Sequence, residues 1–284
     1  MRLLRAGTHA IDVSTPRVMG IVNVTSDSFS DGGRLDAQAA IAHARRLVHD
    51  GSAIIGVGGE STRPNATPVD EDVELERILP IVAPLAQEGV CVSVDTMKPA
   101  VMQAAVAAGA SMINDVRALQ APGALQVLAA SDVAVCLVHM QGEPRTMQQS
   151  PAYRDVVAEV RGFLGRRAHA CLDAGIAADR IVIDPGFGFG KSLAHNLDLL
   201  RHVGDFGALG FPVLVGLSRK SMIGAMTMRA IDDRQAGSIA AALLAASRGA
   251  RLLRVHDVRG TVDALAVWQA VEQGRSPRDL TIEQ

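Results

Sequence analysis

Short runs of β-branched and other apolar residues alternate with longer helical patterns eight times along this chain of 284 residues. Eight strand–helix units of about 30 residues predict a parallel sheet whose strands are joined by helical crossovers. The predicted strands are Val18–Thr25, Ala53–Gly59, Val90–Thr96, Ser111–Val116, Ala134–Met140, Arg180–Asp184, Pro212–Ser218 and Arg251–His256.

The segments between the strands have the N-terminal and C-terminal capping residues that are typical of helices. Asp70 is predicted to be the N-cap of its helix, and Asp72 and Glu74 would favour the positive end of the helix dipole. Glycines stand just before six strands, where the end of a helix requires a left-handed residue: Gly51, Gly89, Gly109, Gly175, Gly210 and Gly249. The clearest predicted helices are Leu35–Asp50, Asp70–Gln87, Pro99–Ala108 and Tyr153–Ala174.

An open doubly wound α/β sheet could also hold eight strands. Two observations favour a closed barrel: no dinucleotide-binding fingerprint follows the first strand, and the polar residues do not gather at one switch point. We therefore predict an eight-fold β/α (TIM) barrel that occupies 1–284 as a single domain. Arg2–Arg17 is predicted to form a short N-terminal hairpin that closes the bottom of the barrel.

Composition restricts the partners and the compartment. The formal net charge of −2 gives no general attraction to nucleic acid or to an anionic membrane. No apolar run approaches the length of about 20 residues that a membrane span needs, and the N-terminus lacks a signal-peptide core. Cys91, Cys136 and Cys171 are far apart without metal-binding spacing, and we expect Cys91 and Cys136 to be buried thiols. We therefore expect a cytoplasmic protein.

One predicted crossover helix departs from the usual pattern. Ala236–Ser247 is apolar almost all round, whereas an outer helix of a barrel buries only one face. Either a covering loop or tail of the same chain or a second copy of the chain would bury the additional face. We favour the second explanation and predict a homodimer.

Every predicted strand delivers functional side chains to its carboxyl end. Active sites of β/α barrels are assembled there, so we predict that these residues surround one site. In strand order they are Asn23; Glu60, Ser61, Thr62 and Arg63; Asp95 and Thr96; Asn114 and Asp115; His139 and Met140; Asp184; Ser218, Arg219 and Lys220; and Arg254, His256 and Asp257.

The chemical groups at these ends indicate two kinds of ligand. Asp95, Asn114 and Asp184 suit a heterocycle with amino and ring N–H groups. Cationic side chains such as Arg63, Arg254 and His256 suit an anion at the mouth of the barrel, because arginine binds phosphate in a bidentate fork. A planar amino-heterocycle that carries a phosphate-like group would satisfy both sets.

Other motifs are weaker guides. DPGFGFGKS lacks the spacing of a phosphate-binding P-loop, and its glycines are predicted to let the backbone approach a flat ligand beside Phe187 or Phe189. Lys220 could form a Schiff base, but we favour hydrogen bonding or charge stabilisation for it. The chain has no GxSxG or HExxH motif, so hydrolase and zinc-protease functions have no support.

A resemblance to a known family covers Gly20 to Asp257. GIVNVTSDSFSDGG, GGESTRP, SVDTMKP, MINDV, HMQGEPRTMQ, DPGFGFGK, VGLSRKSMIG and RVHDV, in this order, resemble the motifs of the bacterial dihydropteroate synthases. The resemblance implies a transferase of folate biosynthesis that condenses (7,8-dihydropterin-6-yl)methyl diphosphate with 4-aminobenzoate. The products would be 7,8-dihydropteroate and pyrophosphate, with Mg²⁺ as cofactor and sulfonamide-type compounds as inhibitors.

The resemblance also implies a role for each matching residue. Arg63, Lys220, Arg254 and His256 would be catalytic, and Asn23 would be the ligand of Mg²⁺. Aminobenzoate would bind among Phe29, Thr62, Arg63, Pro64 and Ser218. The diphosphate would contact Asn23, Thr62, Arg63, Arg254 and His256, and the pterin would contact Asp95, Asn114, Met140, Asp184, Phe189, Gly216, Lys220 and Arg254.

The implied reaction begins with departure of pyrophosphate, which cations assist by neutralising its charge. The dihydropterin can spread the positive charge left on its methylene, so an SN1-like path without a protein nucleophile is expected. Two other functions stay open: a methyltetrahydrofolate methyltransferase, which should lack the STRP and SRKS loops, and a catalytically silent pterin-binding paralogue or regulatory subunit.

Three positions depart from the family pattern. Gly56 stands where the family usually has aspartate, within a predicted strand that a glycine weakens. Ser26 and Asn65 replace a common proline and glycine in two loops, where variation is ordinary. We hypothesise that Gly56 costs stability or activity.

Overall fold

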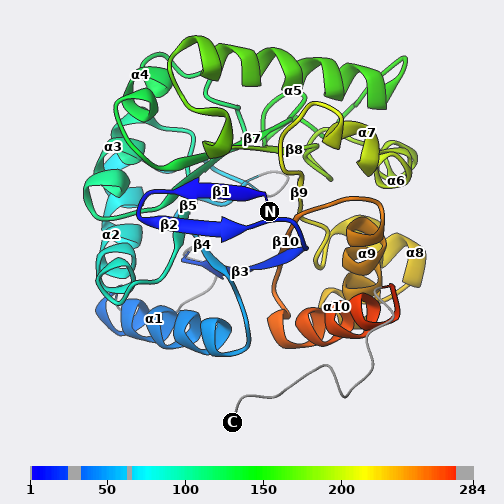
Figure 1. The fold of residues 1–284 in the computed structure, drawn as a ribbon, viewed down its shortest axis with the longest axis horizontal. Coiled ribbons are helices and arrows are strands. Elements are labelled where there is room, and N and C mark those ends of the chain that lie inside the picture. Colours follow the sequence, from blue (N-terminus) through cyan, green and yellow to red (C-terminus); the bar gives the residue numbers. More distant parts are fainter. Residues whose placement is uncertain (1, 25–32, 63–65, 273–284) are drawn as a thin grey trace.

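Eight parallel strands form a single closed sheet in the computed structural model, which describes residues 2–24, 33–62 and 66–272 (Figure 1). The strand order is β8-β7-β6-β5-β4-β3-β10-β9, and a parallel bridge between Ile183 and Val213 joins the two end strands. The strands are β3 (Arg17–Asn23), β4 (Ile54–Gly58), β5 (Val92–Asp95), β6 (Met112–Asp115), β7 (Ala134–Val138), β8 (Ile181–Asp184), β9 (Leu214–Val215) and β10 (Leu252–Val255).

Helices surround this sheet and complete the predicted eight-fold β/α barrel (Figure 1). They are α1 (Gly33–His49), α2 (Glu71–Gln87), α3 (Pro99–Ala107), α4 (Ala124–Ala129), α5 (Val156–Asp173), α6 (Leu193–Arg201), α7 (Val203–Gly207), α8 (Ser221–Thr227), α9 (Gln235–Ser247) and α10 (Val258–Glu272), with short 3-10 turns at Ala178–Arg180 and Ile231–Asp233.

The predicted elements are found in order, with their ends shifted by a few residues. The largest difference is at β9, which contains only two residues: Pro212 at its predicted beginning has no amide hydrogen to donate to the sheet, and residues 216–218 lie outside the strand. Thr25, the predicted end of the first strand, lies outside the described residues. All six glycines predicted before strands have left-handed backbone, with φ between 77° at Gly89 and 104° at Gly249.

The N-cap prediction for Asp70 is confirmed in position. The backbone of Asp70 is extended, but its side chain makes no capping hydrogen bond. The acidic residues of the first turn of α2 still stabilise the positive end of the helix dipole. Two other helices are capped by side chains. Asp155 accepts a hydrogen bond from the Ala158 amide at α5, and Ser192 forms a capping box with His195 at α6.

An antiparallel hairpin closes the amino-terminal end of the barrel, as predicted (Figure 1). It consists of β1 (Leu3–Ala6) and β2 (His9–Asp12). Leu4 and Ile11 are buried in the same apolar cluster as Met19, Ile54 and Met112, which lie near the beginnings of their strands. The hairpin therefore fills the space that the inward side chains leave at this end.

Alternation along the strands divides the apolar residues into two cores. Residues such as Val94, Ile113 and Leu137 belong to a large cluster between the sheet and the helices. Cys136 and Val182 belong to a second cluster inside the barrel. Because neighbouring residues alternate between these cores, the last inward position of each strand meets the mouth of the barrel.

We predict that replacing Gly56→Ala will stabilise the barrel. A Cβ atom at this position would lie 3.6 Å from Met19 Sδ and from the Gly20 carbonyl oxygen, which are ordinary contact distances. Glycine within a strand is less stable than alanine by about 0.5–1 kcal/mol, and urea unfolding should show a gain of this size. Gly59→Ala is the control, because its Cβ would lie 2.8 Å from Ile78 Cγ2 and should destabilise the protein. A loss of stability in Gly56→Ala would contradict the prediction.

Candidate active site

Residues at the carboxyl ends of four neighbouring strands form one row around the barrel mouth. Pairing in register connects Asn23 to Gly58, Gly58 to Asp95, and Asp95 to Asn114. Side chains two residues earlier on the same strands form the row beneath, which contains Ile21, Gly56, Ser93 and Met112. The strand pairing thus gathers polar groups that lie far apart in the sequence.

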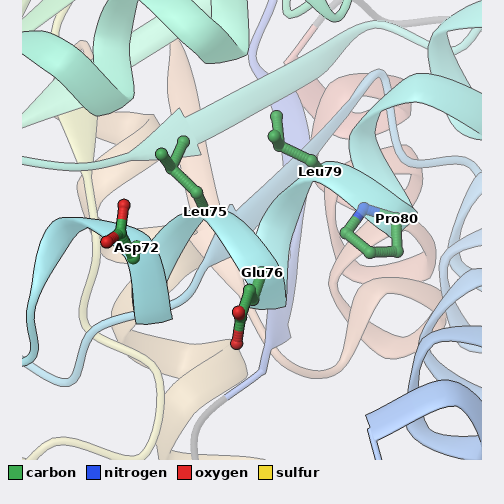
Figure 2. Close-up of a pocket in the computed structure, with 5 residues that line it drawn as sticks. All are labelled: Asp72, Leu75, Glu76, Leu79 and Pro80. Carbon is green, nitrogen blue, oxygen red and sulfur yellow. The ribbon is translucent and has the colours of Figure 1, made fainter.

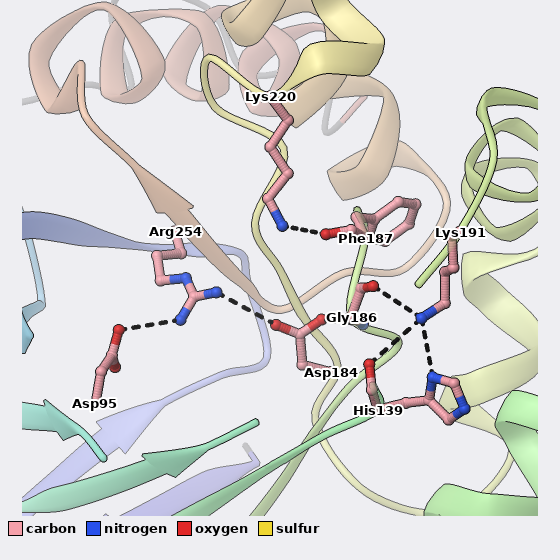
Figure 3. Close-up of polar contacts among 8 residues, drawn as sticks. All are labelled: Asp95, His139, Asp184, Gly186, Phe187, Lys191, Lys220 and Arg254. Atoms are coloured by element: carbon pink, nitrogen blue, oxygen red, sulfur yellow. Dashed lines mark hydrogen bonds and ion pairs between the residues drawn. The ribbon is translucent and has the colours of Figure 1, made fainter. Parts of the chain in front are cut away.

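A buried arginine lies between two carboxylates of this mouth. Arg254 Nη1 is 3.4 Å from Asp95 Oδ2, and Nη2 is 3.9 Å from Asp184 Oδ2 (Figure 3). Gly216 leaves the space for this guanidinium, since a Cβ at residue 216 would lie 3.1 Å from Arg254 Nε. Pairing with two carboxylates offsets the cost of burying the charge.

Three buried polar atoms beside this cluster make no hydrogen bond of good geometry in the described part of the chain, although the Asn114 side chain lies close enough to Asp95 to lower the pKa of that carboxyl. They are Asp95 Oδ1 and both amide atoms of Asn114, a residue with only 1% of its surface exposed. Buried polar groups in folded proteins are nearly always hydrogen-bonded. A ligand with both donors and acceptors would satisfy the carboxylate and the amide together.

The glycine-rich turn after β8 forms one wall of the site, and two of its glycines have a role that the sequence did not indicate. A Cβ at Gly186 would lie 1.8 Å from the His139 carbonyl oxygen, and one at Gly190 would lie 2.3 Å from the Gln141 carbonyl oxygen. These two glycines therefore allow the turn to pack against the end of β7, and the predicted close approach of the turn to a flat ligand stays a prediction.

The two phenylalanines of this turn separate. Phe187 is fully buried in the outer core, whereas Phe189 lies in the inner cluster, against which Met140 packs. Phe189 also lies beneath Lys220, whose Nζ is 4.5 Å from the centre of its ring. Phe189 is thus the aromatic residue that the turn presents to the mouth.

Lys220 faces the same space from the loop after β9. Its Nζ donates a hydrogen bond to the Phe187 carbonyl oxygen (Figure 3). Burial and the nearby Arg254 charge lower the pKa of Lys220 to about 7, against the attraction of Asp184. The desolvation that the sequence does not reveal is therefore present in the fold.

The outer part of the mouth contains a serine–histidine pair. Ser218 Oγ accepts a hydrogen bond from the His256 backbone amide at 3.2 Å and lies 3.0 Å from Nδ1 of the same imidazole. Ser218 was predicted to line an aminobenzoate pocket, and the structure shows that its hydroxyl also orients His256.

Of the remaining predicted residues, some lie at the rim of the barrel and others lie outside the described residues. Asn23 is exposed at the rim, and Thr62 is half-buried after β4. No group of three histidine, cysteine, aspartate or glutamate residues within 2–24, 33–62 and 66–272 could hold a metal ion. The predictions for Phe29, Arg63 and Pro64, and the departures at Ser26 and Asn65, lie outside the described residues.

Two lysines near the site, the half-buried Lys98 and the buried Lys191, were given no role from the sequence. Lys98 Nζ is 2.5 Å from Glu60 Oε2 and 2.5 Å from Glu74 Oε2, so it ties the end of β4 to α2. Lys191 lies beneath the glycine-rich turn, with its Nζ 2.9 Å from His139 Nδ1. A lysine directly after the glycines was a visible signal, but its partner lies 52 residues away.

The Lys191–His139 pair carries strong pKa shifts. Burial lowers the pKa of Lys191 to about 7, against the attraction of Asp184. Burial and the Lys191 charge lower the pKa of His139 to about 3. At neutral pH the imidazole is therefore neutral and accepts a hydrogen bond from the lysine at Nδ1.

A separate hollow of about 390 Å³ lies on the outer surface of the barrel, over α2 (Figure 2). Its lining contains acidic and apolar side chains of a single helix and none of the strand-end residues. The lining residues are Asp72, Leu75, Glu76, Leu79 and Pro80. The hollow is therefore not part of the candidate active site.

None of the helices in 33–62 and 66–272 is both long and apolar enough to cross a membrane. All three cysteines are free and buried, as predicted for Cys91 and Cys136.

Comparison with known proteins identifies close relatives. A family model described as "Pterin binding enzyme" matches residues 19–256. The dihydropteroate synthase of Haemophilus influenzae is 48% identical over 269 residues, which cover 94% of this chain and 98% of that protein.

Solved structures agree with this match. The dihydropteroate synthase of Xanthomonas albilineans with 4-aminobenzoic acid is 54% identical, with a TM-score of 0.90 and coverage of 97% and 99% of the two chains. The same enzyme with 7,8-dihydropteroate gives 0.86 at 49% identity, with coverage of 98% and 100%. A Yersinia pestis dihydropteroate synthase in complex with a sulfonamide drug gives 0.91 at 47% identity, with coverage of 95% and 99%.

The His139 environment predicts a loss of stability in mild acid. The unfolded chain binds a proton at the ordinary histidine pKa of about 6.5, whereas the folded chain resists protonation down to about 3. Between these values the unfolded state binds more protons, so this group alone lowers the free energy of unfolding by up to about 1.4 kcal/mol for each pH unit of acidification.

Urea unfolding between pH 5 and 7 tests this assignment. We expect a clearly shallower acid-side slope in His139→Gln than in the unsubstituted protein, because glutamine does not titrate. The exposed His49 supplies the matched control, His49→Gln, which should keep the original slope. Equal slopes in all three proteins would show that His139 is not held neutral.

Proposed function

Because the chain belongs to the pterin-binding enzyme family and, within it, to the dihydropteroate synthases, which are transferases, we propose how its own residues carry out the reaction. The proposed substrates are (7,8-dihydropterin-6-yl)methyl diphosphate and 4-aminobenzoate. Condensation gives 7,8-dihydropteroate and pyrophosphate, as a step of folate biosynthesis.

The unpaired polar atoms of Asp95 and Asn114 carry this proposal. A pterin ring presents an amino group, ring N–H groups, ring nitrogens and an oxo group along its edges, so it supplies both donors and acceptors. Asp184 accepts from the 2-amino and ring N–H groups, and Asp95 and Asn114 bind the opposite edge. In this binding mode, the three polar atoms of Asp95 and Asn114 each gain a hydrogen-bond partner on the pterin.

The faces of the pterin are held by side chains from other strands. Met140 and Phe189 form an apolar wall, and Arg254 stacks on the ring with its planar guanidinium. Gly216 leaves room for Arg254, and Lys220 binds the 4-oxo oxygen and a ring nitrogen. The half-buried position of Lys220 and the contact of its Nζ with the Phe187 carbonyl oxygen at the mouth support this assignment.

The diphosphate lies at the outer mouth, where the cationic side chains are. Arg254 and His256 bind it, together with Asn23, Thr62 and Arg63. Ser218 orients the imidazole of His256 toward this anion. Phe29, Thr62, Arg63, Pro64 and Ser218 surround the aminobenzoate, and the same pocket accepts sulfonamides, as the drug complex of the Yersinia pestis enzyme suggests.

The rim residues fit a magnesium ion. Mg²⁺ prefers oxygen ligands, takes few from protein and keeps several waters. Asn23 offers an exposed amide oxygen at the end of β3, and no cluster of carboxylates in the described residues would compete for the ion. Asn23 would hold Mg²⁺ together with oxygens of the diphosphate, and the ion would supply charge neutralisation to the leaving group.

The chain's residues support an SN1-like path. The bond between the pterin methylene and the diphosphate oxygen breaks with its electron pair on the oxygen, where Arg254 and His256 stabilise the charge. The pterin, held by Asp184 and Asn114, spreads the positive charge of the methylene. The aryl amine then forms the new C–N bond and loses a proton. No side chain acts as a nucleophile, so Arg63, Lys220, Arg254 and His256 act by binding and charge.

The outer face of α9 supports a homodimer. Residues such as Ala241 and Ala245 are buried against the barrel, whereas Leu244 is 47% exposed on the opposite side of the helix. Val267 on the neighbouring α10 is 67% exposed, and Met228 after α8 is 88% exposed. A second copy of the chain would cover this apolar surface.

The proposed compartment is the cytoplasm, because the three cysteines of the chain are free thiols.

Product formation tests the proposed function. With Mg²⁺ present, the chain should convert the pterin diphosphate and 4-aminobenzoate into 7,8-dihydropteroate and one equivalent of pyrophosphate.

Asp184→Ala should weaken pterin binding in calorimetry by roughly 1.5–3 kcal/mol, since it removes charge-assisted hydrogen bonds. Asp198→Ala on the surface of α6 is the control and should leave the affinity unchanged. No product with Mg²⁺ would contradict the function, and unchanged affinity in Asp184→Ala would contradict its role.

Sedimentation tests the dimer. We expect the unsubstituted protein to sediment as a dimer at micromolar concentration and Leu244→Glu to sediment as a monomer, because a charge would be buried in the interface. Leu172→Glu on α5 is the matched control, since Leu172 is 38% exposed and lies on a different face. A monomeric unsubstituted protein, or a dimeric Leu244→Glu, would overturn the proposal.

A further inference from the structure

Lys191 is a buried ammonium group without a carboxylate partner in the described residues. Only 3% of its surface is exposed, and its Nζ lies 2.9 Å from His139 Nδ1, 2.9 Å from the Gly186 carbonyl oxygen and 3.0 Å from the Phe189 carbonyl oxygen. The His139 carbonyl oxygen is a fourth acceptor, 3.3 Å from Nζ, so four acceptors surround the three N–H donors of the ammonium group. Burying a charge in this way is costly, so the contacts need an explanation beyond packing.

Each acceptor of Lys191 adjoins a different wall of the pterin slot. Gly186 donates its amide hydrogen to Asp184 Oδ1 at 2.7 Å, so the position of its peptide influences that carboxylate. Phe189 lies beneath Lys220. His139 directly precedes Met140 at the end of β7. One side chain thus connects the edge, the floor and the side of the slot.

The turn lies between two ammonium groups. Lys191 binds the Gly186 carbonyl oxygen from within the protein, and Lys220 binds the Phe187 carbonyl oxygen from the mouth (Figure 3). Lys191 also binds the Phe189 carbonyl oxygen. Because the two lysines bind different carbonyls of one short turn, the inner lysine fixes the surface that the outer lysine contacts.

We propose that Lys191 is a positioning residue for the pterin: from beneath the glycine-rich turn it holds Asp184, Phe189 and Lys220 in the arrangement that binds the ring. The inference rests on the proposed function, because it assigns the ligand of the slot as the pterin. It does not involve the aminobenzoate, which binds at the outer mouth.

Other contacts also hold the turn, and they provide a matched control. Tyr153 donates its hydroxyl hydrogen to the Gly190 carbonyl oxygen at 2.9 Å, at the far end of the turn from Asp184. Tyr153→Phe removes one hydrogen bond of the same turn without touching the carbonyls of Gly186 or Phe189. It therefore distinguishes a general loosening of the turn from a loss of the Lys191 contacts.

The test compares Lys191→Met with Tyr153→Phe. Methionine keeps the length of the side chain but donates no hydrogen bond. We expect the calorimetric Kd of Lys191→Met for (7,8-dihydropterin-6-yl)methyl diphosphate to rise at least tenfold. Its KM for 4-aminobenzoate at saturating pterin should stay within twofold. Tyr153→Phe should leave both values within twofold of the unsubstituted protein.

Each other outcome overturns a definite statement. If the unsubstituted protein binds no pterin diphosphate, the proposed function is wrong. If it binds and Lys191→Met binds equally well, or if the Kd for the pterin diphosphate and the KM for 4-aminobenzoate rise together, the positioning role is wrong. If Lys191→Met does not melt cooperatively, Lys191→Gln, which keeps a polar group, replaces it. The change in its Kd for the pterin diphosphate is compared in the same way with the change in its KM for 4-aminobenzoate. If neither variant folds, the lysine supports the barrel and not the slot, and the inference fails.

Discussion

The contact of Arg254 with Asp95 and Asp184 is the interaction on which the site depends. Burial and the neighbouring Asp184 raise the pKa of Asp95, and the Arg254 guanidinium between the two carboxylates opposes this shift. Other features follow from its position: Gly216 has no side chain because the arginine occupies that space, and the arginine charge contributes to the lowered pKa of Lys220. A ligand that binds the carboxylates must therefore accommodate the arginine as well.

The barrel produces this cluster through simple alternation. The residue two positions before Asp95 is Ser93, and the residue two positions before Asn114 is Met112. Side chains two residues apart point to the same side of the sheet, so the next inward residue after the buried interior already belongs to the site. Helices and hairpin seal the other surfaces, and most polar side chains of the inward faces therefore lie where the strands end. Gly56 belongs to the row just beneath, beside Ser93, whose hydroxyl is buried without a partner in the described residues. A residue at this level influences the site from below.

Much of this arrangement follows from the sequence. Strand-end residues such as Asn114, Asp184 and Arg254 were predictable, because parallel strands must deliver their last residues to one rim. Contacts between loops were not, since Lys191 meets His139 across 52 residues and Lys98 meets two glutamates from other elements. Local patterns do not encode which loops touch. For the same reason the packing of Gly186 was not predictable: only the fold shows the His139 carbonyl oxygen against it.

A crystal structure of the protein with 7,8-dihydropteroate would test the central claim most directly, because it locates the ligand relative to every group of the mouth. The account predicts the pterin ring between Met140 and Arg254, with its amino edge on Asp184 and its other edge on Asp95 and Asn114. The benzoate would lie toward Ser218 at the outer mouth. Dihydropteroate bound elsewhere, or bound with Asp95 and Asn114 still lacking partners, would contradict it.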